Sequence, residues 1–299
     1  MLRSKKRSLE DILLDVFIYT FLFSLIAITL YPFLNTLAVS LNEGLDSIKG
    51  GIYLWPREFT TYNYESLLTD PQIFHAAGVS LARTVLTTVF GTFLTAMLAY
   101  VISRKDFVLR KFITFIYVLT MYVQGGLIPT YFLYQRLGLT NNFWVYVLPG
   151  LVAAFNLIIV RTYINGLPES LIESAKIDGA SEFTIFLKII LPLSKPVLAT
   201  IAIFTAVYHW SAWWDVFLYN SSNPALSTLQ YELMKVLASA NSMSGSMQQG
   251  LSNAAQTAQI TPRAIRATMT IIVTVPIAVI YPFLQKYFVH GLTLGGVKE

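Results

Sequence analysis

Long apolar stretches without a charged residue constrain this chain more than any other feature. Only 12% of its 299 residues are charged, whereas soluble domains carry about 25%. A helix that crosses a bilayer needs about 20 mostly apolar residues, because lipid offers the backbone no hydrogen-bond partner. Six stretches qualify: Val16–Asn42, Thr84–Ser103, Phe112–Gln135, Leu137–Val160, Pro196–Trp214 and Ala267–Gln285. The sequence therefore predicts an all-α membrane protein with six transmembrane helices.

Other features narrow the class further. A seventh uncharged stretch, Val236–Pro262, is rich in Ser, Asn and Gln, which favours a solvated loop within a polar outer segment, Asn220–Pro262. The first apolar stretch is too long for a cleaved signal peptide. The chain contains no cysteine, which excludes disulfides, thiolate metal sites and cysteine nucleophiles.

Lysine and arginine set the predicted orientation, because they concentrate in cytoplasmic segments. With the N-terminus inside, fourteen basic residues fall in inner segments and six in outer ones. Both termini are then cytoplasmic, and the net charge of +5 reflects topology rather than nucleic-acid binding. Arg83 lies within the second span, where a polar residue usually faces the protein interior or water, although it is close enough to the outer end to reach the headgroups.

We divide the chain into three parts. Residues 1–15 combine a basic cluster with apolar residues at helical spacing, which indicates a cytoplasmic or interfacial segment. Residues 16–290 form the transmembrane domain, and residues 291–299 form a cytoplasmic tail.

The longest cytoplasmic loop, residues 165–192, carries a helix–glycine–helix pattern. Ser170 and Glu173 have the spacing of a capping box, which predicts a helix over about 171–178. Gly179 suits the position after such a helix, where the backbone turns left-handed, and Ser181 suits the N-cap position of a second helix. In that second helix one apolar stripe is expected from Phe183, Phe186, Leu187 and Ile190. Two capped helices at a membrane surface suit a docking element, or ordinary surface helices packed on their own bundle.

The same loop carries a recognisable motif. Its residues match the pattern E-A-A-x3-G-x9-I-x-L-P, with serine at the second position: Glu173, Ser174, Ala175, Gly179, Ile189, Leu191 and Pro192. This resembles the signature of permease subunits of ABC importers. The runs Gly125–Gly150 and Tyr281–Glu299 are similar to carbohydrate-importer permeases of the maltose-transporter G-subunit type, in the branch for oligosaccharides and polysaccharide fragments. The resemblance covers roughly the whole chain from the first span onward, and Glu299 stands where that family usually has glycine.

The resemblance implies a type I ABC importer permease fold and a role in importing an oligosaccharide or polysaccharide fragment. In that family this loop docks on a cytoplasmic ATPase subunit. Glu173 would then meet a basic residue of the ATPase, unless it serves only the capping box; Ala175 would allow close approach, and Gly179 would provide the turn. The implied coupling residues are Glu173, Ser174, Ala175, Asp178, Gly179, Ile189, Leu191 and Pro192.

The resemblance also implies partners in the bacterial cytoplasmic membrane. They are a second permease, two ATPase subunits and an extracytoplasmic sugar-binding protein that touches the outer loops Glu43–Asp70 and Asn220–Pro262. The tail would reach between the ATPase subunits through Gly291, Gly295, Gly296 and Lys298, although such a glycine-rich end could also be disordered.

No cofactor is expected in this chain. It has no G-x4-G-K-[ST] phosphate loop, so ATP and Mg²⁺ are expected on the ATPase partner. Its three histidines are isolated and have no metal-ligand spacing. With no paired carboxylates or serine elbow either, the chain is not expected to be an enzyme on its own.

The substrate path is less well marked. Candidate residues are Asn156, Trp210, Trp213, Trp214 and Asp215. Aromatic rings stack on sugars, but Trp213 and Trp214 also suit an interfacial aromatic belt, and Asn156 equally suits helix–helix hydrogen bonding.

The rival function that fits the sequence best is an ABC permease for a non-sugar solute. An ion-coupled secondary transporter would need acidic residues within its spans, and the six spans as delimited contain none. A membrane-embedded enzyme would need a convergent polar site.

Overall fold

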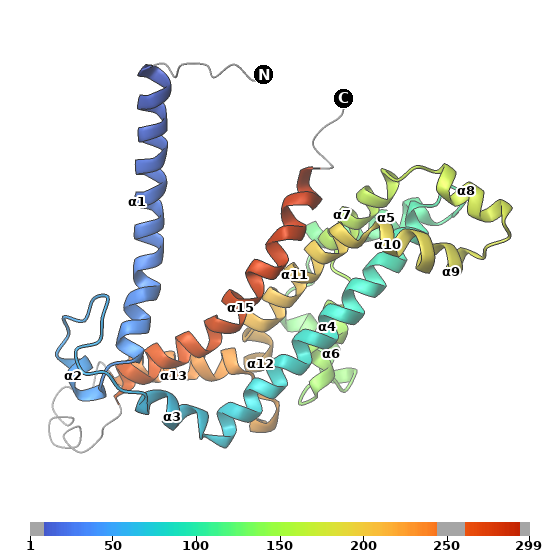
Figure 1. Ribbon diagram of the computed structural model, residues 1–299. Helices are drawn as coiled ribbons and strands as arrows, with labels where there is room; N and C mark the ends of the chain where they lie inside the picture. The colour runs from blue at the N-terminus through green and yellow to red at the C-terminus, as the bar shows by residue number, and fades with distance from the viewer. Residues whose placement is uncertain (1–8, 244–260, 294–299) are drawn as a thin grey trace. The chain divides into compact units, whose positions relative to one another are not determined.

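The computed structural model describes residues 9–243 and 261–293, and the regular elements within those residues are helices (Figure 1). An isolated bridge joins Asn42 and Phe59. The predicted all-α fold is confirmed for the described residues. In chain order the elements are α1 (Leu9–Ser40), α2 (Gly44–Ile48), α3 (Tyr62–Leu68), α4 (Pro71–Ser103), α5 (Arg110–Tyr122), α6 (Leu127–Arg136), η1 (Phe143–Tyr146), η2 (Leu148–Gly150), α7 (Ala154–Asn165), α8 (Ser170–Ile177), α9 (Glu182–Ile185), η3 (Phe186–Ile190), α10 (Leu191–Leu193), α11 (Lys195–Ser211), α12 (Trp214–Tyr219), η4 (Pro224–Leu226), α13 (Leu229–Met243) and α15 (Pro262–Thr293).

The chain divides into two compact units. The first contains the residues up to Thr69 together with Val236–Ile272, and the second contains Asp70–Lys235 together with the residues from Val273 onward. In the first unit the end of α1 packs on the start of α15 through Ala38, Val39 and Ala267. The second unit holds the 165–192 loop and the helices on which it rests.

Several described helices could cross a membrane. α1, α4 and the Pro262–Ile280 part of α15 are each long and apolar enough. Two pairs of helices joined at a bend are also long and apolar enough if each pair is taken as one span: Phe143–Gly150 with Ala154–Asn165, and Glu182–Leu193 with Lys195–Ser211. The predicted third span is instead divided into α5 and α6 at residues 123–126. The count of six spans and the cytoplasmic termini therefore stay predictions.

Three predicted boundaries differ in the structure. α1 continues without a break from Leu9 through the predicted boundary at residue 16. α4 begins at Pro71, well before the predicted span, because Asp70 accepts a hydrogen bond from the Gln72 backbone and proline suits the first helical position. The loop predicted from residue 236 is wrong up to Met243, because α13 continues to that residue; residues 244–260 lie outside the described part of the chain.

The long helix α4 is central to the second unit, where it packs against α7 and α11. Its buried face carries small residues at spacings of four, eleven and eight: Ala76, Ser80, Gly91 and Ala99. Small residues let neighbouring helix backbones approach closely. At Gly91 the approach is closest, since a Cβ atom there would lie 2.8 Å from the carbonyl oxygen of Leu151.

We expect Gly91→Ala to destabilise the protein by about 1–3 kcal/mol, because the added methyl would collide with backbone that cannot rotate away. Gly78→Ala is the matched control, because Gly78 lies in the same helix and a Cβ there meets nothing within 4 Å. The measurement is the temperature at which detergent-solubilised protein aggregates. Equal thermal stability of the two variants would contradict the prediction.

Candidate functional site

The 165–192 loop folds as two helices joined at Gly179, as the sequence predicts. Gly179 has φ +76°, in the left-handed region that glycine adopts without strain. The backbone N–H groups of Gly179 and Ala180 donate to the carbonyls of Lys176 and Ala175, respectively. These two bonds form the Schellman motif, which satisfies carbonyls at the end of α8.

The two predicted N-caps have different outcomes. The Ser181 hydroxyl accepts a hydrogen bond from the Thr184 N–H at 3.2 Å, so this cap of α9 is confirmed. The capping box at Ser170 is wrong, because Ser170 is itself the first residue of α8 and no side chain caps that helix. Glu169 occupies the N-cap position, and its carboxylate is bound to basic side chains instead.

The predicted apolar stripe of the second helix is only partly correct. Phe186 and Ile190 are buried, whereas Phe183 and Leu187 are exposed. From Phe186 to Ile190 the helix is the π-helical turn η3, and the Leu191 N–H donates to the Phe186 carbonyl, five residues earlier. This wider turn changes the helical period, and Ile185 joins the buried side chains.

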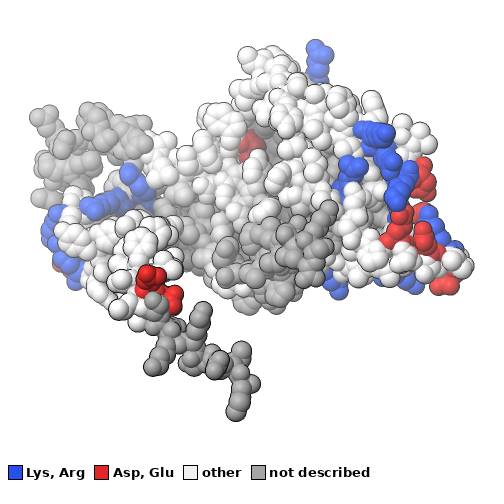
Figure 2. Space-filling view, turned by 90° about the horizontal axis from the view of Figure 1, so that it is seen from above, with Lys and Arg blue, Asp and Glu red and all other residues white. Residues whose placement is uncertain are grey.

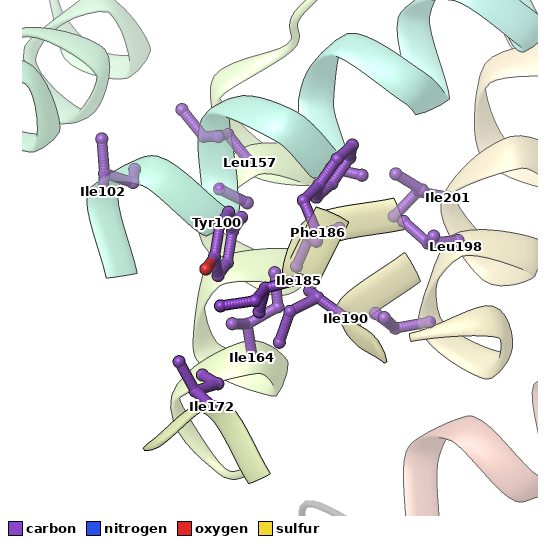
Figure 3. Close-up of a cluster of buried hydrophobic side chains, with 14 residues drawn as sticks. Tyr100, Ile102, Leu157, Ile164, Ile172, Ile185, Phe186, Ile190, Leu198 and Ile201 are labelled. Carbon is purple, nitrogen blue, oxygen red and sulfur yellow. The ribbon is translucent and has the colours of Figure 1, made fainter. Parts of the chain in front are cut away.

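Buried apolar side chains fix the 165–192 loop to the transmembrane helices. Figure 3 shows Ile172 of α8 and Ile185 and Phe186 near α9 meeting residues of α4, α7 and α11 in one cluster. The Phe186 ring stacks on Tyr100 and meets the edge of Phe93, with ring centroids 5.8 Å apart in each pair. Aromatic rings bury large apolar areas, so Phe186 is a strong anchor for the loop.

Ion pairs attach the start of α8 to the turn between α4 and α5. Glu169 Oε2 lies 2.6 Å from Lys105 Nζ, and Glu169 Oε1 lies 3.5 Å from Arg104 Nη2. The hydrogen bond from Lys105 lowers the pKa of Glu169, which keeps this carboxylate charged. Figure 2 shows basic and acidic side chains intermingled at the end where Figure 1 places α8 and α9.

A second polar group joins α8, α9 and α4. Glu182 Oε1 lies 2.6 Å from Lys176 Nζ, and the Tyr100 hydroxyl donates to Glu182 Oε2 at 2.5 Å. Asp106 is 3.9 Å from the same lysine. The hydrogen bonds from Lys176 and then Tyr100 lower the pKa of Glu182, and the bond to Glu182 raises that of Lys176. All three helices therefore meet at one carboxylate.

The opposite face of α8 is exposed and combines acidic with apolar side chains. Glu173, Ser174 and Asp178 are exposed, and the neighbouring Ile177 is 87% exposed. Within the part of the chain that the structure describes, no ion pair or hydrogen bond holds the Glu173 carboxylate. Such a surface has the chemistry to contact a groove that offers a basic residue and apolar walls.

The remaining motif residues lie elsewhere on the loop. Ala175, Ile189 and Leu191 are half-buried and pack against the apolar cluster, and Pro192 is exposed. The motif therefore contains outward-facing residues and residues that hold the loop in place.

Arg83 is buried in the protein interior, which is one of the two positions expected for it, and does not extend to the headgroups. It is 1% exposed, and its Nη2 lies 2.5 Å from Oδ2 of Asp215. Its Nη1 also donates to the Ala212 carbonyl at 3.3 Å, and the Tyr146 ring lies 4.6 Å away. A charge in an apolar span needs a partner, so a lone arginine within a span was the signal that could have indicated this pair.

The other candidate path residues make structural contacts. Trp210 Nε1 donates to the Val273 carbonyl at 2.9 Å, and Asn156 Nδ2 donates to the Thr205 hydroxyl at 3.4 Å, joining α7 to α11. Trp213 and Trp214 meet edge to face with centroids 5.4 Å apart. The structure thus brings the last two together beside Asp215, at the break between α11 and α12.

The predicted tail is only partly described. Gly291 lies within α15, which continues to Thr293. Gly295, Gly296 and Lys298 lie outside the described residues.

We expect Asp215→Asn to destabilise the protein by about 3 kcal/mol, because it leaves the buried Arg83 charge without a counter-ion. The double variant Arg83→Met with Asp215→Asn should recover part of the lost stability, because it removes the unpaired charge. Lys105→Met is the control, because its pair with Glu169 is exposed and exposed pairs contribute at most about 1 kcal/mol. Thermal aggregation in detergent measures all three. An Asp215→Asn variant as stable as the parent would refute the importance of this pair.

Known proteins share both the sequence and the fold. Residues 88–294 match the family described as "Binding-protein-dependent transport system inner membrane component". The polygalacturonan/rhamnogalacturonan transport system permease protein YtcP of Bacillus subtilis (strain 168) is 34% identical over 97% of this chain and 100% of its own. Protein LplC of the same organism is 36% identical over 95% of this chain and 94% of its own.

A solved structure agrees with these sequence matches. It is of a bacterial ABC transporter involved in the import of the acidic polysaccharide alginate, and one of its chains superposes with a TM-score of 0.85 at 25% identity. The superposition covers 95% of this chain and 100% of that chain. The predicted resemblance and permease fold are confirmed: the chain belongs to the family of inner membrane components of binding-protein-dependent transport systems and is a membrane permease subunit.

Proposed function

We propose that this permease forms part of an ATP-driven importer that carries an oligosaccharide or polysaccharide fragment across the bacterial cytoplasmic membrane. YtcP is named for polygalacturonan and rhamnogalacturonan transport, and the superposed transporter imports alginate. The observation that carries the proposal is the match to YtcP along 97% of the chain. Polymers of uronic acids are therefore the first substrates to test.

The exposed face of α8 is the proposed contact with the ATPase subunit. Glu173 supports this assignment, because its carboxylate is exposed and does not serve as a helix cap. Ser174, Asp178 and Ile177 continue the same exposed surface. Gly179 shapes the end of α8, while Ala175, Ile189, Leu191 and Pro192 belong to the loop that presents this face. ATP and Mg²⁺ would bind to the ATPase partner, with no cofactor in this chain.

The remaining assignments follow the family. A second permease would complete the pathway, and an extracytoplasmic binding protein would deliver the substrate to the loops Glu43–Asp70 and Asn220–Pro262. Six spans with cytoplasmic termini would place the 165–192 loop inside. The tail, with Gly291, Gly295, Gly296 and Lys298, would contact the ATPase subunits.

Asn156, Trp210, Trp213, Trp214 and Asp215 remain candidates for the path. The exposed Trp214 ring is the best of them for stacking on sugar, since Trp210 and Asn156 already bind neighbouring helices. The Asp215 carboxylate is bound to Arg83, so it is poorly suited to carrying a proton or cation in an ion-coupled mechanism.

Coupling would proceed by alternating access. ATP binding would bring the two ATPase subunits together and draw with them the loops docked on their surfaces. Because Phe186 anchors the 165–192 loop in the apolar cluster, this displacement would reach the transmembrane helices and open the permease pair outward.

We expect Ile177→Asp to weaken ATPase binding roughly 30-fold, the loss of about 2 kcal/mol typical of a central contact. The variant should fold normally, because the Ile177 side chain is 87% exposed and so contributes little to packing. Val108→Asp is the matched control, since Val108 is also apolar and 91% exposed but lies outside α8. Co-purification with the ATPase provides the measurement. Equal retention by both variants would argue against docking through α8.

The substrate class is tested with the reconstituted importer and its binding protein. Oligogalacturonates or alginate fragments should stimulate ATP hydrolysis, and neutral oligosaccharides and amino acids are included for comparison. Stimulation by a non-sugar solute alone would contradict the proposed substrate class.

A further inference from the structure

Tyr100, near the inner end of α4, contacts the 165–192 loop in two ways. The Tyr100 ring is 4% exposed and stacks on Phe186, and its hydroxyl donates to Glu182. The residue therefore makes both an apolar and a polar contact with the loop. Stacked rings can slide over each other, whereas a hydrogen bond to a carboxylate is directional and resists sliding.

Glu182 extends this connection to the docking helix. Its other carboxylate oxygen binds Lys176, which lies in α8. The two residues stand on either side of the Gly179 turn, so their ion pair closes the angle between α8 and α9. A displacement of α8 would therefore act on Glu182, and through it on Tyr100. Because the pKa of Glu182 is lowered, the carboxylate that makes both bonds stays ionised near neutral pH.

The helix that receives this contact reaches far across the second unit. α4 is continuous over 33 residues and has no proline after its first position. Arg83, on the outer half of the same helix, is bound to Asp215 at the break between α11 and α12. Tyr100 and Arg83 are about 25 Å apart along the helix axis, at 1.5 Å per residue. A stiff helix held at both points can pass a movement from one to the other.

We propose that the Tyr100–Glu182 hydrogen bond is the connection through which movement of the 165–192 loop is passed to α4, which makes Tyr100 and Glu182 positioning residues for transport. This inference rests on the proposed function, since the movement originates in the ATPase. It assigns to α4 the task of carrying the movement outward.

A single labelled cysteine on α4 reports the movement directly. The chain contains no cysteine, so Phe74→Cys creates a unique labelling site, and Phe74 is 78% exposed near the outer end of α4. The complex with both permeases and the ATPase is reconstituted, the cysteine carries a fluorophore, and ATP is added. ATP hydrolysis is measured in the same samples.

In the Phe74→Cys background, ATP should change the fluorescence. Tyr100→Phe removes only the hydroxyl and keeps the stacked ring, so we expect normal assembly and ATP hydrolysis. The fluorescence change should be reduced by a factor of about five or more, which is the scale of a modest coupling energy. Glu182→Gln keeps an oxygen that can accept the hydrogen bond from Tyr100, so its fluorescence change should be reduced less than that of Tyr100→Phe. Lys105→Met, which removes the exposed ion pair between Lys105 and Glu169, should leave the signal unchanged.

Each outcome decides one question. A full signal in Tyr100→Phe, equal losses in Tyr100→Phe and Lys105→Met, or no ATP-dependent signal in a hydrolysing parent complex would each overturn the role of the bond. A parallel fall in assembly and signal would reduce Tyr100 to a structural residue and overturn it as well. A parent chain that forms no ATP-hydrolysing complex would instead refute the proposed function.

Discussion

The lack of hydrogen-bond partners in lipid is the constraint on which the second unit depends. A polar group in a membrane helix needs a partner within the protein, and two polar side chains of α4 are paired with neighbouring elements. Arg83 binds Asp215, and the Ser80 hydroxyl accepts a hydrogen bond from the Leu229 backbone. At Gly91 the absence of a side chain lets the backbone at Leu151 approach α4 closely. The paired polar residues and the small residues of α4 thus join this helix to its neighbours in the second unit.

The 165–192 loop divides its residues between two tasks. Apolar side chains such as Phe186 hold it against the transmembrane helices, and charged side chains such as Glu182 connect its helices to α4. The acidic and apolar face of α8 around Glu173 is left exposed. A loop that is rigidly mounted and still presents a free surface is suited to transmit force from a partner, because little of the movement is lost in its own deformation.

Local features of the loop were predictable, and features that depend on distant segments were not. The left-handed Gly179 and the Ser181 cap are set by backbone geometry within a few residues. The predicted stripe is interrupted by a π-helical turn at Phe186–Ile190, so a simple 3.6-residue period failed there. The partner of Arg83 was not predictable for a related reason, because a one-dimensional sequence shows the charge but not the carboxylate that will meet it.

The sequence alone determined that the chain is an all-α membrane protein and that residues 165–192 carry the permease motif, because apolar length and motif spacing are properties of contiguous residues. The tertiary structure decided which charges meet. Arg83 and Asp215 are 132 positions apart, and Tyr100 and Glu182 are 82 apart. Such pairs form only when packing brings α4 beside α11 and the 165–192 loop, since nothing in either local sequence specifies its partner.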